Sequence, residues 1–282
     1  MPRGNSREDM LRRAVRKGYA KVAKQETSCC TQASSTCCTK STIAEISKRI
    51  GYSQQEIESV PEGANLGLGC GNPLALASLE PGEVVLDLGS GAGFDCFLAA
   101  KRVGKNGRVI GVDMTPEMVD KARANARRGK YANVEFRLGE IENLPVADNT
   151  IDVIISNCAI NLSPDKGRVF QEAFRVLKPG GRIMISDIVL TKQLPDHIKK
   201  DIQAYVGCLS GAELKRRYLK LIEDAGFSQV KILEETHFPA EGVINDQTAR
   251  AITKKLKISR QEVAKLASTV ASVKVSGIKP KL

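Results

Sequence analysis

Three cysteines lie in surroundings that indicate chemistry more than packing. Cys158 follows an apolar run that ends at Ser156, while Cys70 and Cys208 lie in glycine-rich turns. Residues just beyond the carboxyl ends of parallel strands line the ligand crevice of an open sheet. Cys96 lies inside a predicted helix, where cysteine is usually a small buried hydrophobe. Because thiolates are soft ligands, the other three together indicate a site for a soft ion.

The remaining cysteines form two adjacent pairs near the start of the chain. They are Cys29-Cys30 and Cys37-Cys38, within the polar segment Thr27–Thr42, which we expect to be loop. The chain has no C-x-x-C pair, and its two histidines are His197 and His237. The usual zinc-ribbon and zinc-finger spacings are therefore absent from the sequence.

The composition is that of an ordinary globular protein. The chain has 282 residues, of which 42% are hydrophobic and 27% are charged, enough for one large domain with an appendage. No apolar run approaches the ~20 residues of a membrane-spanning helix, and the N-terminus lacks the apolar core of a secretory signal. We therefore expect a cytoplasmic protein, without a permanent disulfide framework.

The net charge of +11 is concentrated in residues 12–24 and 254–281. Such an excess can indicate a nucleic-acid or membrane partner. Aromatic residues make up only 4% of the chain and do not alternate with the N-terminal basic residues. A stacking surface for single-stranded nucleic acid is therefore poorly supported. We expect solvated helix faces, with neither nucleic acid nor membrane as a partner.

The middle of the chain has the alternating pattern of strands and helices that is typical of a doubly wound parallel sheet. Short apolar runs predict five strands, at Val84–Leu88, Arg108–Val112, Val134–Leu138, Asp152–Ser156 and Arg182–Ser186. Helical segments separate them, and two begin with Thr115-Pro116 and Ser163-Pro164, where Pro suits the first helical position. Alternation of strands and helices predicts an α/β fold with right-handed crossovers.

Flanking elements are predicted on both sides of this core. The expected helices are Arg7–Ala23, Thr42–Gly51, Ser53–Val60, Asp196–Cys208, Ala212–Ala225 and Arg260–Ser268, and the expected strands are Gln229–Leu233 and Ala271–Val275. The two strands could extend the sheet at one edge. We expect three regions: a basic helix with a Cys-rich arm over residues 1–60, a cofactor-binding core over 61–190, and a substrate-capping region with edge strands over 191–282.

The first strand of the core leads into a glycine-rich loop that opens a helix. Its sequence is G-x-G-x-G, with Gly89, Ser90 and Gly91 at its start, and differs from the G-x-G-x-x-G of dinucleotide binders. Asp87, two residues before the first glycine, would repel a pyrophosphate. Beside the sulfonium and ammonium of S-adenosylmethionine it could be attractive, by organising the loop.

Polar residues also follow the next three strands. Asp113 ends the second strand, at the usual offset of a carboxylate that binds ribose hydroxyls, and Met114 follows it. Glu140-Ile141-Glu142 follows the third strand, where an adenine edge would lie, and Asn157 ends the fourth. The alternative is that Asp113 and Glu140 only cap helices. Their order at consecutive strand ends favours a cofactor site.

These segments resemble the class I S-adenosylmethionine methyltransferases. The resemblance covers roughly Asn72–Leu190 and rests on VVLDLGSGAGF, VIGVDMT, RLGEIENLP and VLKPGGRIMISD. It implies a Rossmann-like, seven-stranded sheet whose last strand is antiparallel. It also implies that a group of residues surrounds the cofactor, namely Asp87, Gly89, Gly91, Asp113, Met114, Ile141 and Glu142.

Three thiolates suit a soft ion with pyramidal coordination, and trivalent arsenic has that preference and keeps a lone pair. Zinc would require a fourth ligand. The lone pair could attack the electrophilic methyl group of a sulfonium, and no general base is needed because the nucleophile carries no proton. Catalysis would then consist mostly of alignment. This agrees with a site that offers no obvious catalytic histidine.

The cysteine segments resemble arsenite S-adenosylmethionine methyltransferases. The matching segments are NLGLGCGNP, ISNCAINLSPDK, YVGCLSGA and the TSCC element at Thr27–Cys30, so the resemblance covers nearly the whole chain from Tyr19 onward. It implies that Cys158 and Cys208 hold arsenic(III) as substrate throughout, with Cys70 as a further ligand. A monomer that acts in arsenic detoxification is the expectation.

The resemblance also implies a redox role for the N-terminal cysteines. Methylation formally oxidises arsenic, so a thiol reductant such as thioredoxin or glutathione is implied as co-substrate. This chain departs from the family pattern by its second pair, Cys37-Cys38. The departure leaves open which N-terminal thiol acts, and we favour Cys29 and Cys30.

Other functions explain part of the sequence. A carbon or oxygen methyltransferase for a small organic molecule would explain the cofactor residues but not the three thiols. A nucleic-acid methyltransferase would explain the charge, but the fourth strand is followed by Ser156-Asn157-Cys158-Ala159, not the Asn/Asp-Pro-Pro-aromatic run typical of DNA amino-methylating enzymes. A non-enzymatic metalloid-sequestering protein would use the same thiols without turning over a cofactor.

Overall fold

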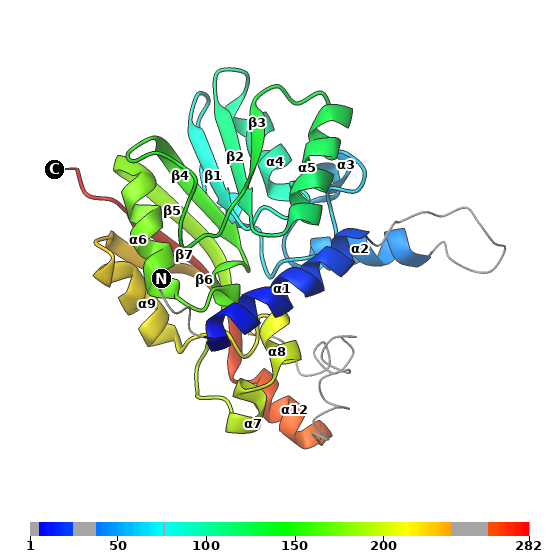
Figure 1. Cartoon of the computed structure of the whole chain (residues 1–282), viewed down its shortest axis with the longest axis vertical. Helices are drawn as coiled ribbons and strands as arrows, with labels where there is room; N and C mark the ends of the chain where they lie inside the picture. Colours follow the sequence, from blue (N-terminus) through cyan, green and yellow to red (C-terminus); the bar gives the residue numbers. More distant parts are fainter. Residues whose placement is uncertain (1–5, 25–37, 76, 238–258, 282) are drawn as a thin grey trace.

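A computed structural model describes residues 6–24, 38–75, 77–237 and 259–281. A seven-stranded sheet with the order β3-β2-β1-β4-β5-β7-β6 forms its centre (Figure 1). The strands are β1 Val84–Leu88, β2 Arg108–Asp113, β3 Val134–Leu138, β4 Ile151–Asn157, β5 Leu177–Leu190, β6 Ser228–His237 and β7 Val270–Ile278. The first five pair in parallel, and β7 pairs antiparallel to both β5 and β6. The predicted α/β fold, including the reversed strand implied by the resemblance, is confirmed.

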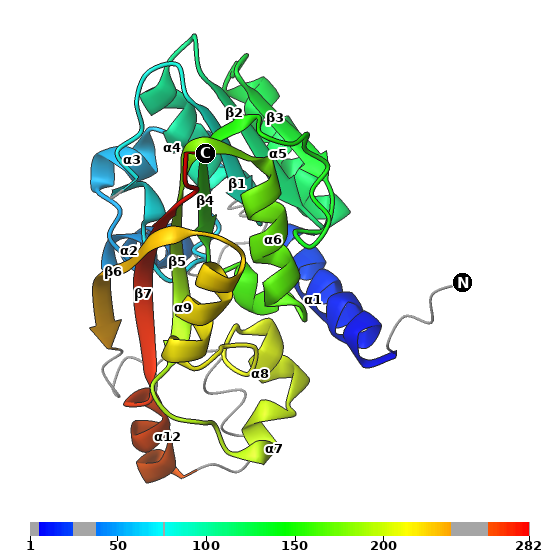
Figure 2. The same ribbon diagram turned by 90° about the vertical axis from the view of Figure 1, so that its left-hand side faces the viewer.

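Helices cover both faces of the sheet. They are α1 Ser6–Lys24, α2 Cys38–Arg49, α3 Gln54–Glu58, α4 Phe94–Val103, α5 Pro116–Arg128, α6 Lys166–Val176, α7 Asp196–Lys199, α8 Ile202–Val206, α9 Lys215–Asp224 and α12 Arg260–Ala267. On one face α4 and α5 bury Phe97 and Val119 against β1 and β2. On the other face α6 and α9 bury Phe170 and Tyr218. Figure 2 shows these two helices in front of the sheet.

Three predicted helices have different bounds in the structure, two of them because of local side-chain caps. Helix α6 begins at Lys166 rather than at Pro164, because the carboxylate of Asp165 accepts a hydrogen bond from the Arg168 amide at 2.9 Å. The predicted helix Asp196–Cys208 is broken into α7 and α8, since Asp201 caps α8. Helix α2 begins at Cys38, so the prediction of loop over Thr27–Thr42 is wrong from Cys38 onward.

Strand β5 is much longer than its predicted range. It pairs with β4 as far as Ser186, and beyond that point it pairs with β7 as far as Leu190 opposite Val270. Its far end packs in an apolar cluster with residues of α7 and α8. The strand therefore connects the central sheet to the C-terminal helices (Figure 2).

Helix α1 lies across the edge of the sheet where the parallel strands end (Figure 1). It contacts α5 on one side and α8 on the other, and Val15 on its inner face is only 1% exposed. Within the described residues, no helix is both long enough and apolar enough to cross a membrane.

Candidate active site

A cavity lies at the carboxyl ends of β1, β2 and β4, between these strands and α1. Nine of the ten predicted cofactor residues line it: Asp87, Gly89, Ser90, Gly91, Asp113, Met114, Ile141, Glu142 and Asn157. Cys158 belongs to the same lining. The prediction that these residues share one crevice therefore agrees with their positions in the structure.

The glycine-rich loop is shaped by its backbone. Gly89 has a φ of 77°, and a Cβ there would lie 2.3 Å from the Cβ of Ala159, so only glycine fits. The carboxylate of Asp113 accepts hydrogen bonds from the amides of Gly91 at 3.0 Å and Thr115 at 2.8 Å. Asp113 therefore orders the loop and also faces the cavity.

Two buried carboxylates lie behind this loop. Asp87 accepts a hydrogen bond from the Cys96 thiol at 3.2 Å, and Asp95 accepts one from the Tyr52 hydroxyl at 2.6 Å. Burial raises the pKa of Asp95 to about 6, although its hydrogen bonds oppose the rise, and burial also raises the pKa of Asp87. A positively charged ligand in the cavity would stabilise both carboxylates.

The residues of the cavity fit S-adenosylmethionine. The hydroxyl of Ser90 is buried in the wall and has no hydrogen-bond partner among the described residues, which suits a polar ligand. A positively charged ligand would favour the ionised forms of Asp87 and Asp113, and Met114 and Ile141 supply apolar surface next to them. This combination of polar, acidic and apolar groups matches a ligand that has an adenosine and a charged sulfonium.

Asp113→Ala should weaken the binding of S-adenosylmethionine by at least roughly tenfold, because a charge-assisted hydrogen bond contributes ~1.5–3 kcal/mol. Calorimetry with S-adenosylhomocysteine, the demethylated product, gives the dissociation constant. An unchanged constant would show that the carboxylate is only structural.

Glu140 is the one predicted cofactor residue outside the lining. It forms an ion pair with Arg16 of α1 at 3.2 Å, and Arg12 of the same helix approaches Glu142 at 3.4 Å. The ion pair of Glu140 with Arg16 thus helps to hold α1 over the cavity. Sequence reasoning missed that α1 contributes Arg12, Val15 and Tyr19 to the lining.

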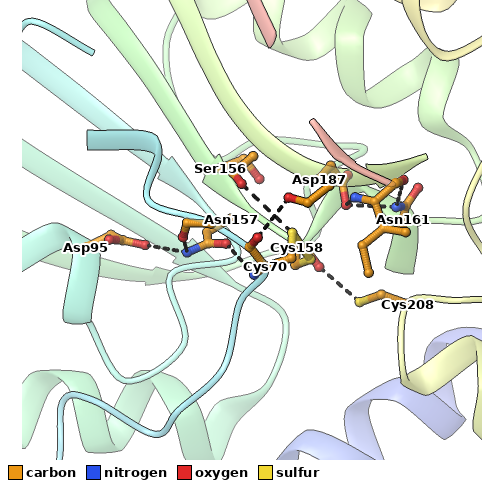
Figure 3. Close-up of a disulfide and its surroundings, with 12 residues drawn as sticks. Cys70, Asp95, Ser156, Asn157, Cys158, Asn161, Asp187 and Cys208 are labelled. Atoms are coloured by element: carbon orange, nitrogen blue, oxygen red, sulfur yellow. Dashed lines mark hydrogen bonds between the residues drawn. A yellow bond between two sulfur atoms is a disulfide. The ribbon is translucent and has the colours of Figure 1, made fainter. Parts of the chain in front are cut away.

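Asn157 lines the cofactor cavity, and Figure 3 shows it next to Cys70. Its side-chain nitrogen donates hydrogen bonds to the carbonyl of Gly71 at 2.7 Å and to Tyr52 at 2.9 Å, and its oxygen accepts one from the Cys70 amide at 3.0 Å. This single side chain therefore holds the glycine-rich turn that carries Cys70 against the end of β4.

The three predicted cysteines converge at this end of the sheet (Figure 3). Cys70, Cys158 and Cys208 form one buried cluster, with exposures of 8%, 8% and 5%. Cys70 and Cys158 are joined by a disulfide, and the Cys208 thiol donates a hydrogen bond to the Cys158 carbonyl at 3.2 Å. Sequence reasoning expected free thiolates here, so the disulfide is a difference: two of the three sulfurs are oxidised.

Backbone strain accompanies the cluster. Cys158 has a φ of 58° and Cys208 a φ of 63°. Both lie in the left-handed region of backbone angles, which residues other than glycine rarely adopt. Such strain persists only where the surroundings fix it, and it concentrates at functional sites. The two cysteines are therefore held in place at an energetic cost to the fold.

A buried carboxylate, Asp187, lies beside the cysteines. Its oxygen and the sulfurs of Cys70 and Cys158 lie within 4.8 Å of one another. Asp187 accepts hydrogen bonds from Asn161 at 2.8 Å and Tyr218 at 3.0 Å, and burial raises its pKa to about 7. Burial raises the pKa of Cys208 to about 12, and Asp187 adds to the rise. Cys208 is therefore a protonated thiol at neutral pH.

The other predicted cysteines differ in position. Cys96 is fully buried in α4, as expected for a packing residue. Cys29, Cys30 and Cys37 lie outside the described residues, and Cys38 is the first residue of α2.

The reversed seventh strand and the glycine-rich loop at the end of β1 define a Rossmann-like methyltransferase fold. In agreement, residues 79–226 match the family described as methyltransferase domain. The chain therefore belongs to the methyltransferase family, and arsenite methyltransferases are among its homologues.

Two curated relatives illustrate the similarity. The arsenite methyltransferase of Halobacterium salinarum is 50% identical over 236 residues, which cover 80% of this chain and 60% of the relative. The human arsenite methyltransferase is 39% identical over 158 residues, covering 53% of this chain and 42% of the relative. The chain thus spans about half of the length of the curated relatives it matches.

Solved structures give the same picture. The structure of an arsenic(III) S-adenosylmethionine methyltransferase from Chlamydomonas reinhardtii superposes with a TM-score of 0.60 at 31% identity, covering 88% of this chain and 75% of that one. A phosphoethanolamine N-methyltransferase from Haemonchus contortus superposes with a TM-score of 0.58 at 20% identity, covering 76% and 54%, and shows the fold alone.

Proposed function

We propose that this chain transfers methyl groups from S-adenosylmethionine to trivalent arsenic held by Cys70, Cys158 and Cys208. The observation that carries the proposal is the convergence of these three cysteines in one buried cluster, of which Cys158 also lines the cofactor cavity. A generic methyltransferase needs no such cluster. The similarity to arsenite methyltransferases supports the same substrate, and detoxification of arsenic in the cytoplasm would be the role.

Loading of the substrate requires three thiols. Each thiol replaces one hydroxyl of arsenous acid, and its proton leaves with that hydroxyl as water. The Cys70–Cys158 disulfide must therefore be reduced first, by a thiol reductant such as thioredoxin or glutathione. Binding then exchanges three protonated sulfurs for three arsenic–sulfur bonds, so the high pKa of Cys208 presents no obstacle: its proton has an acceptor in the leaving hydroxyl.

The cofactor supplies an electrophilic methyl group on a positively charged sulfur. On the protein side, Asp113 and the glycine-rich loop fix the cofactor, while the cysteines fix the lone pair of arsenic. A carbon–arsenic bond forms and the methyl–sulfur bond breaks, so arsenic is oxidised by two electrons. A pair of thiols can return arsenic to the trivalent state by forming one disulfide.

The direct test is incubation of the reduced chain with arsenite, methyl-labelled cofactor and a dithiol, followed by chromatographic speciation of arsenic. We expect labelled methylarsenicals to form in step with S-adenosylhomocysteine. Binding of arsenite without release of S-adenosylhomocysteine would instead indicate a metalloid-sequestering protein. Methyl transfer to a quinone or another small organic molecule, with none to arsenic, would move the substrate to that class.

We predict that replacing Cys29 and Cys30 together by Ser blocks methylation of arsenite, because one of these thiols would deliver inorganic arsenic to the three-cysteine site and then withdraw. The same replacement should spare methylation of monomethylated trivalent arsenic. The singly methylated substrate has two positions left for thiolates, which Cys158 and Cys208 can fill. X-ray absorption of the arsenic-bound protein would report the sulfur count in each case.

Replacement of Cys37 and Cys38 is the matched control and should leave both reactions largely intact. If this control lost arsenite methylation while the first double mutant kept it, the N-terminal thiol needed for that reaction would belong to Cys37 or Cys38. If neither lost it, no N-terminal thiol would be needed and Cys70 would suffice as the third sulfur.

A further inference from the structure

Helix α1 reaches the cysteine cluster as well as the cofactor cavity. Gly18 packs so closely against α8 that a Cβ at this position would lie 2.8 Å from a methyl carbon of Val206. Cys208 follows α8 by two residues. The close approach at Gly18 therefore brings the next residue, Tyr19, to the turn that carries Cys208.

The Tyr19 side chain lines the same cavity as Asp113 and Cys158. Its hydroxyl is in hydrogen-bond contact with the Cys208 sulfur. The Cys208 thiol in turn donates to the carbonyl of Cys158 at 3.2 Å. The hydroxyl of Tyr19 therefore donates to the sulfur, and a chain of two hydrogen bonds runs from α1 to the end of β4.

We propose that Tyr19 is a positioning residue that orients the Cys208 sulfur toward Cys158 and so links the helix over the cofactor to the thiol site. The inference deepens the proposed function and rests on it for the identity of the substrate.

The surroundings of Cys208 explain why such a partner is needed. Its backbone is in the left-handed region, and its thiol is directed to the Cys158 carbonyl. A hydrogen-bond donor stabilises electron density on sulfur and restricts rotation about the Cα–Cβ bond. The ionic contacts of Arg12 and Arg16 hold α1 over Glu142 and Glu140. Those contacts thereby keep Tyr19 in register with Cys208.

Tyr19→Phe removes the hydroxyl and keeps the ring. On the reduced protein, we expect the dissociation constant for arsenite to rise about tenfold, because a hydrogen bond to a charged or polarised group contributes on that scale. The absorbance of arsenic–thiolate bonds measures this constant. The affinity for S-adenosylhomocysteine, by calorimetry, should change less than about twofold, since the ring still covers the cavity.

Tyr205→Phe is a matched control. Tyr205 is on α8, is 7% exposed, and donates a hydrogen bond to the Leu162 carbonyl at 3.2 Å rather than to a sulfur. This variant should bind arsenite like the parent. Equal arsenite affinity of Tyr19→Phe and the parent, or equal losses in the two variants, would overturn the proposal.

A second measurement separates this inference from the proposed function. In the reduced protein without arsenic, the alkylation rate of Cys208 by iodoacetamide can be followed by peptide mass spectrometry and expressed as a ratio to the rate in the parent. We expect Tyr19→Phe to slow alkylation of Cys208 severalfold, and Tyr205→Phe to leave the ratio unchanged. An unchanged ratio in Tyr19→Phe would refute the contact. A changed ratio in a chain that never methylates arsenic would refute only the proposed function.

Discussion

Cys158→Ser and Cys208→Ser should each abolish arsenite methylation, with a loss of at least about a hundredfold, and leave cofactor binding intact. A serine hydroxyl is a hard ligand that keeps its proton at neutral pH, so it cannot replace a thiolate on a soft ion. Both sulfurs lie in the buried cluster at the ends of β4 and α8. The assay is product formation at saturating arsenite, with S-adenosylhomocysteine binding measured on the same samples.

Cys96→Ser is the matched control for this pair. Cys96 is a buried cysteine outside the cluster, and its only described side-chain hydrogen bond is the one it donates to Asp87, which a serine hydroxyl can also donate. We expect this variant to keep most of its activity. Parental activity in Cys158→Ser or Cys208→Ser would remove that residue from the arsenic site.

Activity should depend completely on prior reduction of the chain. With Cys70 and Cys158 joined, Cys208 is the one free thiol of the cluster, and a single sulfur cannot hold a pyramidal ion. We expect no arsenic–thiolate absorbance from the oxidised chain, and restoration of it when a dithiol or a thioredoxin system is added. Binding of S-adenosylhomocysteine should be similar in both forms, because Cys158 is the one disulfide cysteine among the residues that line the cofactor cavity.

A thiol reductant can reduce arsenic as well as the Cys70–Cys158 disulfide. The experiment must therefore separate its effect on arsenic from its effect on the protein. The chain can be reduced, freed of reductant by gel filtration without oxygen, and tested for arsenite binding alone. Binding by this sample attributes the requirement to the disulfide. If the untreated oxidised chain bound arsenite equally well, the Cys70–Cys158 bond would play no part in substrate loading.

The core of the fold was predictable because its signals are local. β1 and β3 have the predicted bounds, and β2 and β4 exceed them by one residue at one or both ends, because short apolar runs between glycines mark buried parallel strands. The breaks at Asp165 and Asp201 were missed, since a capping carboxylate competes with neighbours that have equal propensity. The full length of β5 depends on β7, which lies some 80 residues further along the chain.

The candidate site also contains residues that the sequence predicts and residues that it does not. Residues at strand ends, such as Asp113 and Cys158, were predictable because parallel strands bring their carboxyl ends to one edge. The contribution of Tyr19 was not, since α1 reaches the cavity through tertiary packing that no periodicity encodes. Nor does the sequence state whether Cys70 and Cys158 are oxidised, because pairing depends on the distance between their Cα atoms, 5.9 Å here.

The length of β5 has a consequence for unfolding. Its first part is the neighbour of β4 in the centre of the sheet, and its last residues pack among α7 and α8. A single strand that belongs to two clusters makes their stabilities interdependent, so the C-terminal helices and the central sheet should melt in one cooperative transition. Because Cys158 ends β4 and Cys208 follows α8, the site is built from both sides of this cooperative unit. A substitution that lowers the free energy of unfolding by a given amount should therefore lower the fraction of molecules with an intact site equally, whether it lies in the sheet or in the C-terminal helices.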